Sequence, residues 1–151
     1  MTVSFDSNLF VYAADSSAGP RHGRALIMVE RALQARRGIL ILQTLAEFFA
    51  VVTRKLGTRP EEARRYLAGL RAALPVQPAS EPDLDAAMLA VQDHGLSFWD
   101  AMLWATAERV GVRYLLTEDF QNRRVLGRVT FVDPFDPANA DLLERELPPT
   151  S

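Results

Sequence analysis

Four acidic residues stand where the chain would bring carboxylates to a common site. Asp6 ends an apolar stretch at the start of the chain, and Asp119 follows another at 112–117. Asp100 falls in the first turn of an expected helix, and Glu47 has apolar neighbours on both sides. Ionised carboxylates are rarely buried unless a partner offsets their charge. Together the four offer the oxygen ligands that hard divalent cations such as Mg²⁺ prefer.

Each of these acids also has a structural explanation. Asp is a favoured helix N-cap, so Asp6 and Asp119 could each begin a helix. Asp100 follows Ser97 by three residues, which is the spacing of a capping box. Glu47 could simply point to solvent. The metal-site hypothesis therefore rests on the set of four and not on any one member.

Apolar stretches of strand length alternate with segments of helical periodicity. We expect strands at about 2–5, 39–42, 74–77, 112–117 and 129–132. We expect helices ending at about 14, spanning about 44–55 and 98–110, and beginning at Pro20, at Pro60 and after Ser80. This alternation predicts an α/β fold with three layers, α/β/α, around a central, mostly parallel five-stranded sheet. Ligands bind at the carboxyl edge of such sheets, where Asp6 and Asp119 would lie.

Apolar spacing also predicts which helix faces turn inward. In the helix at 44–55 the inward stripe consists of Leu45, Phe48, Phe49 and Val52. In the helix after Ser80 the predicted apolar side consists of Leu84, Ala87, Met88 and Val91. A last helix after Pro137 and a frayed tail would form a C-terminal extension at 136–151.

Composition narrows the functional class. The chain has 151 residues, enough for one domain with a real core, and no run of about 18 apolar residues that would predict a membrane span. It has no Cys, so neither disulfides nor thiolate metal sites are expected, and a cytoplasmic protein is the natural interpretation. The net charge of −2 argues against a general electrostatic attraction to nucleic acid, so any RNA contact needs a local basic group.

Four short segments resemble the PIN-domain family, in particular the bacterial VapC-type toxins of type II toxin–antitoxin pairs. They are FDSNLF at 5–10, LAEF at 45–48, SFWDA at 97–101 and LTED at 116–119. The resemblance spans nearly the whole chain and implies a PIN-like nuclease domain at 1–135. It also implies an acidic metal site at Asp6, Glu47, Asp100 and Asp119, supported by Ser7, Asn8 and Thr117. Glu118 stands beside Asp119, which leaves two acids competing for one place in that site.

The same resemblance implies a function. A VapC-like protein is expected to be a metal-dependent endoribonuclease that uses Mg²⁺ or Mn²⁺ to hydrolyse RNA phosphodiester bonds. Asp6 and Asp100 would bind the main ion directly, while Glu47 and Asp119 would bind a second ion or orient water. The expected partners are an RNA substrate, an inhibitory antitoxin and a second copy of the chain.

Two rival functions stay open at this point. One is a non-catalytic PIN-like domain that only binds RNA or a partner. The other is a phosphatase with Asp6 as nucleophile, similar to the haloacid dehalogenase superfamily. That superfamily normally has a second Asp two residues further on, where this chain has Asn8.

Overall fold

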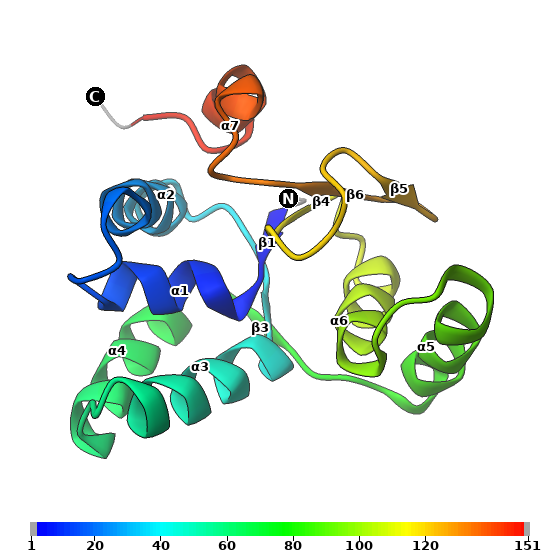
Figure 1. The fold of residues 1–151 in the computed structure, drawn as a ribbon, viewed down its shortest axis with the longest axis horizontal. Helices are drawn as coiled ribbons and strands as arrows, with labels where there is room; N and C mark the ends of the chain where they lie inside the picture. The colour runs from blue at the N-terminus through cyan, green and yellow to red at the C-terminus, as the bar shows by residue number, and fades with distance from the viewer. Residues whose placement is uncertain (1–2, 150–151) are drawn as a thin grey trace.

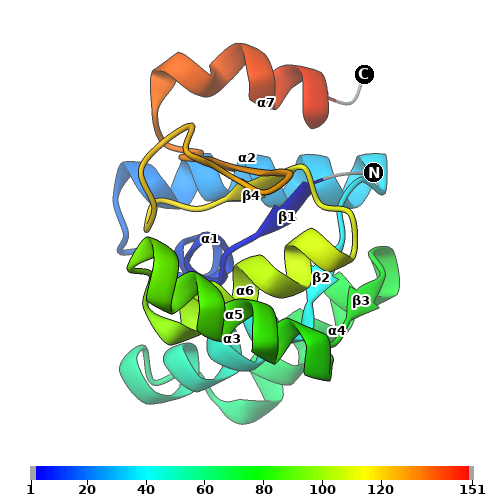
Figure 2. The same ribbon diagram turned by 90° about the vertical axis from the view of Figure 1, so that its right-hand side faces the viewer.

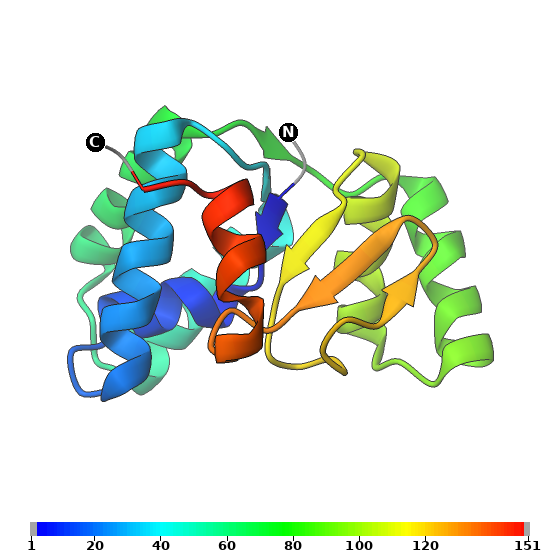
Figure 3. The same ribbon diagram turned by 90° about the horizontal axis from the view of Figure 1, so that it is seen from above.

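The computed structural model describes residues 3–149, and the expected strand residue Thr2 and the last two residues of the tail lie outside them. A central sheet has four strands in the order β1-β4-β6-β5, and Figure 3 shows them side by side from above. Their bounds are Val3–Phe5 for β1, Tyr114–Leu116 for β4, Val125–Leu126 for β5 and Val129–Val132 for β6. The first three strands in this order are parallel, and β5 runs antiparallel to β6. The predicted α/β fold is confirmed.

Strand register aligns the ends of β1, β4 and β6. Phe5 pairs with Leu116, and Leu116 pairs with Val132. The backbone N–H of Asp6 donates to Leu116 O over 2.9 Å, and that of Thr117 donates to Val132 O over 2.9 Å. The residues that follow β1 and β4 therefore leave the sheet together at its carboxyl edge.

The prediction of a single five-stranded sheet was wrong. The strands β2, Leu40–Ile41, and β3, Val76–Gln77, pair with each other in a separate two-stranded parallel sheet. The stretch at 39–42 stays extended for only two residues because Leu42 already begins a helix. β5 was not expected, since Val125–Leu126 is too short to carry a periodic signal, and the turn to β6 relies on Gly127 at φ +60°.

Seven α-helices surround the sheet in the described part of the chain. They are α1 (Ser7–Ala14), α2 (Pro20–Ala35), α3 (Leu42–Lys55), α4 (Pro60–Ala73), α5 (Glu81–His94), α6 (Phe98–Arg109) and α7 (Ala140–Glu146), the last preceded by the 3-10 turn η1 (Pro137–Asn139). Figure 1 shows α7 on one side of the sheet and α6 on the other, and Figure 2 shows α5 beside α6 on the latter side. None of these helices is long and apolar enough to cross a membrane.

The predicted inward face of α3 is confirmed, and that of α5 is largely wrong. Leu45, Phe48 and Val52 are buried in the main core. On α5, by contrast, the predicted residues Leu84, Met88 and Val91 are exposed and Ala87 alone of the four is buried, together with Ala90 and Asp83, which were not predicted. Asp83 is 2% exposed because it receives hydrogen bonds from three groups: Arg109 Nε at 2.8 Å, Thr106 Oγ1 at 3.0 Å and the Ser80 backbone at 2.9 Å.

The segment after the sheet contributes to the same core as the N-terminal helices. Leu142, Leu143 and Leu147 are buried and belong to the cluster that contains Phe5, Phe10 and Met28. Burying three leucine side chains is worth several kcal/mol, at about 1.5–3 kcal/mol each. In the structure α7 is therefore packed against the body of the protein.

Candidate active site

A hollow of about 330 Å³ at the carboxyl edge of the sheet brings together all four predicted acids. Its walls come from the β1–α1 junction, from α3, from the start of α6 and from the turn after β4. The residues that line it are Asp6, Ser7, Asn8, Gln43, Glu47, Ala50, Val51, Arg54, Asp100, Leu103 and Asp119. Larger hollows of about 470, 520 and 410 Å³ lie over α4, beside α2 and between α3 and α4, but the acids lining them number one, two and none respectively.

Asp6 is held rigidly at the end of β1. The residue is 5% exposed, and its carboxylate accepts hydrogen bonds from Thr117 Oγ1 at 2.8 Å and from Ser7 Oγ at 3.2 Å. It occupies the N-cap position of α1, yet its side chain makes no capping hydrogen bond. The structure thus does not bear out the helix-cap explanation for Asp6.

Glu47 is connected to the same network through Ser7. The Ser7 hydroxyl also lies 3.1 Å from Glu47 Oε2, so one hydroxyl proton serves both acids. On α3, Gln43 Nε2 donates to Glu47 Oε1 at 2.8 Å and to the backbone carbonyl of Trp99 at 2.9 Å. Gln43 thereby links the helix that carries Glu47 to the start of the helix that carries Asp100.

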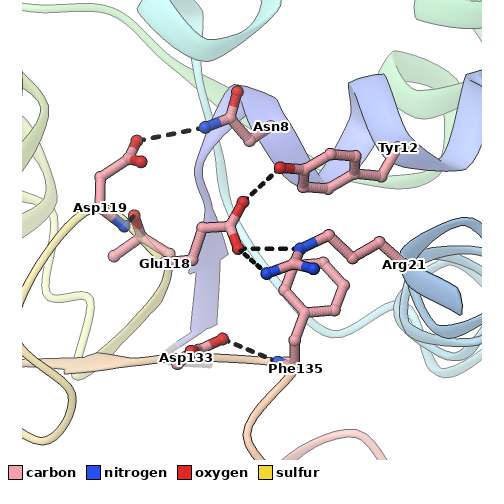
Figure 4. A network of polar contacts seen from close by, with 8 residues as sticks. Asn8, Tyr12, Arg21, Glu118, Asp119, Asp133 and Phe135 are labelled. Atoms are coloured by element: carbon pink, nitrogen blue, oxygen red, sulfur yellow. Dashed lines mark hydrogen bonds and ion pairs between the residues drawn. The ribbon is translucent and has the colours of Figure 1, made fainter. Parts of the chain in front are cut away.

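The turn after β4 separates the roles of two adjacent acids (Figure 4). Asp119 faces the hollow, where Asn8 Nδ2 donates to its carboxylate at 3.2 Å. Glu118 points the other way, accepts a short hydrogen bond from the Tyr12 hydroxyl and pairs with the Arg21 guanidinium at 3.1 Å. Asp119 is therefore the acid of this pair that belongs to the site.

Thr117 connects the two strand ends. Its Oγ1 donates to Asp6 and accepts from the Asp119 backbone N–H at 3.1 Å. The three residues proposed as supports, Ser7, Asn8 and Thr117, thus all contact one or more of the four acids.

Electrostatics indicate that the acids repel one another. The pKa of Asp119 is raised from 3.8 to about 7, first by desolvation, then by hydrogen bonding to Asp6 and by the charges of Asp6, Asp100 and Glu118. Desolvation and the charge of Asp6 also raise the pKa of Asp100, against an opposing hydrogen bond from Ser97. For both residues desolvation is the largest cause and the neighbouring negative charges add to it, so a cation bound beside them would lower both pKa values.

The donor set fits a hard cation, although the side chains do not form a closed cage. Among residues 3–149 no three His, Asp or Glu side chains are gathered tightly enough to hold an ion as they stand. All candidate ligands are carboxylate, hydroxyl or amide oxygens, which suits Mg²⁺ or Mn²⁺.

A pH effect on stability follows from Asp119. Its folded-state pKa of about 7 lies above the ordinary 3.8, so the carboxyl ionises less readily in the folded chain. The resulting contribution to the free energy of unfolding is complete below the ordinary pKa and is lost as the pH rises through about 7. In EDTA, the melting temperature of wild type should therefore fall more steeply than that of Asp119→Asn over this range. If the melting temperatures of the two proteins change equally with pH, the raised pKa does not belong to Asp119.

Comparison with known proteins identifies the architecture. The sequence model of the PIN domain matches residues 3–127. The chain belongs to the PIN domain family. The acids at the ends of β1 and β4 and on α3 and α6 all lie within the matched region of this PIN domain.

Several solved structures share this fold. A toxin–antitoxin complex from Klebsiella pneumoniae matches with a TM-score of 0.64 and 18% identity, covering 89% of this chain and 99% of the other. VapC20 of Mycobacterium tuberculosis, described as a toxin that cleaves the sarcin-ricin loop, matches with a TM-score of 0.62 and 19% identity. The match covers 78% of this chain and 92% of VapC20. VapBC2 from Rickettsia felis, bound to a DNA fragment from its promoter, matches with a TM-score of 0.62 and 14% identity. The match covers 87% of this chain and 97% of the other. A search of curated proteins finds no significant match.

Two further polar residues of the PIN domain, Gln43 and Arg54, line the hollow and were not predicted as site residues. Gln43 precedes Glu47 by four residues, and Arg54 follows it by seven, so all three lie on one face of α3. Helical spacing from Glu47 was the signal that could have identified both.

Proposed function

We propose that this PIN domain is a metal-dependent endoribonuclease and the toxin of a toxin–antitoxin pair. The observation that carries the proposal is the gathering of four carboxylates, from four separate elements, around one open hollow at the carboxyl edge of the sheet. Here no ion pair within 4.0 Å involves any of the four in the described residues.

Each acid has a role in the proposed reaction. Asp6 and Asp100 would hold the main Mg²⁺ or Mn²⁺ ion, and Glu47 and Asp119 would hold a second ion or orient the attacking water. The bound cation would lower the pKa of water and stabilise negative charge on the phosphoryl oxygens. Ser7 and Thr117 fix Asp6, while Asn8 fixes Asp119, so the acids are oriented before RNA arrives.

The proposed partners follow from the same site and from the structural neighbours. The Klebsiella pneumoniae neighbour is a toxin–antitoxin complex. We extend that arrangement to this chain: an antitoxin segment with a basic side chain would neutralise the acidic hollow and exclude the metal. We further propose a homodimer that acts on cytoplasmic RNA.

The adjacent acids Glu118 and Asp119 provide a matched pair for testing the activity. Total cellular RNA is incubated with the purified chain in Mg²⁺ or Mn²⁺, with EDTA as control. Asp119→Asn should slow cleavage by about 100-fold or more, in the range of lost acid–base or ligand groups. Glu118→Gln should stay within a few-fold of wild type, because it removes an equal charge one residue away but outside the hollow.

Other outcomes point to the rival functions. If wild type binds RNA and leaves it intact in both metals, the chain is a binding module. If an aspartyl-phosphate, an acyl phosphate on the carboxyl group of Asp6, forms during turnover, the chain is a phosphatase. Equal losses in Glu118→Gln and Asp119→Asn would contradict the orientation seen in Figure 4.

A further inference from the structure

Arg54 is the one basic residue among those that line the acidic hollow. It lies in the last turn of α3 and is exposed. No hydrogen bond or ion pair joins its guanidinium to another residue in the described range 3–149. A cation beside four carboxylates, yet bonded to none of them, is available for an anionic ligand.

The spacing along α3 places Arg54 next to the acids without putting it among them. Seven residues separate it from Glu47, which corresponds to two helical turns and about 10 Å along the axis. Ala50 and Val51 lie between them and add no charge to the wall of the hollow. A strand of nucleic acid with one phosphate at the carboxylates would therefore bring a neighbouring phosphate to Arg54.

The helix dipole offers a simpler explanation for a basic residue at this point. Cations stabilise the last turn of a helix. Lys55 occupies the same last turn and gains the same benefit, but it does not line the hollow. The dipole explains a charge at the end of α3 and does not explain why one of two such charges faces the acids.

We infer that Arg54 binds a backbone phosphate of the RNA substrate, adjacent to the phosphate that is cleaved. This inference rests on the proposed ribonuclease function. Carboxylates repel a polyanion, and a net charge of −2 provides no general attraction, so a local cation is needed to bring RNA to the site. A guanidinium binds phosphate through two parallel N–H···O bonds, which fixes orientation as well as position.

The inference predicts opposite effects on the two ligands of the hollow. Arg54→Gln should raise KM for RNA by about 10-fold or more and change kcat much less, as for a lost charged hydrogen bond. Binding is also measured with a short fluorescein-labelled single-stranded RNA at several salt concentrations. In Arg54→Gln the slope of log binding constant against log salt concentration should be less steep by about 0.7. Stabilisation by Mn²⁺ alone should be unchanged or larger, because a positive charge near the cation site is gone.

Lys55→Gln is the matched control, since it removes one charge from the neighbouring position. The inference holds if Lys55→Gln keeps the wild-type KM and Arg54→Lys recovers part of the loss. It is overturned if Arg54→Gln binds RNA like wild type, if Lys55→Gln has an equal effect, or if Arg54→Gln loses the Mn²⁺ response. If wild type itself neither binds nor cuts RNA while Mn²⁺ still stabilises it, the proposed function fails instead.

Discussion

Asp6→Asn is expected to abolish metal-dependent cleavage of RNA and to leave the fold intact. Asp6 is the most enclosed of the four acids, and its two oxygens are directed by Ser7 and Thr117. If Asp6 binds the metal directly, as proposed, its replacement should slow cleavage by more than the 10–100-fold typical of groups one step removed from the metal. The measurement is the initial rate of RNA cleavage in Mn²⁺ for both proteins at equal concentration.

The fold should survive because the substitution preserves shape and relieves repulsion. Asn keeps an acceptor oxygen, and a hydroxyl can also accept from the new amide. The charge of Asp6 contributes to the raised pKa values of Asp100 and Asp119, so removing it should leave metal-free stability equal or higher. Circular dichroism and melting in EDTA provide the check. Wild-type cleavage rates in Asp6→Asn would place the catalytic centre elsewhere.

Millimolar Mg²⁺ or Mn²⁺ is expected to raise the melting temperature of wild type by several degrees. A ligand at 100 times its Kd stabilises the folded state by about 2.7 kcal/mol. At about 2–4 °C per kcal/mol for a chain of this size, the shift is about 5–10 °C. Asp6→Asn combined with Asp100→Asn should lose this response, because the double variant removes both residues proposed to bind the main ion directly. Differential scanning fluorimetry at increasing metal concentration measures the melting-temperature shift of wild type and of the double variant.

The control for this shift is an acid of equal charge outside the hollow. Asp141 lies exposed at the start of α7, so Asp141→Asn should keep the full metal response. A shift that persists in the double variant would mean that the ion binds elsewhere on the chain. No shift in wild type at saturating metal would mean that the carboxylates do not converge on an ion without RNA.

Much of the site could be predicted because its parts are local. The first segment of the chain contains Asp6, Ser7 and Asn8 in three consecutive positions, and a strand followed at once by a helix fixes where they lie. Parallel pairing of β1 with β4, in the register that aligns Phe5 with Leu116, then brings Thr117 to Asp6.

What could not be predicted depends on contacts between distant residues. Glu118 and Asp119 are adjacent acids, and their orientations depend on residues about a hundred positions earlier: Tyr12 and Arg21 hold Glu118, and Asn8 holds Asp119. On α5 the spacing favoured Leu84 and Met88 for the core, but pairing of Asp83 with Arg109 on α6 turns another face inward. Short strands were misjudged for the same reason, since pairing partners decide whether two extended residues join a sheet.

The hydroxyl of Thr117 has a consequence for how the site responds to change. It donates to Asp6 at the end of one strand and accepts from the backbone of Asp119 beyond the end of the next. Because one small group fixes both positions, their energetic contributions are not independent, and the loss from altering two of these residues differs from the sum of the single losses. The two strand ends therefore behave as one cooperative unit, which ties the geometry of one acid to that of the other.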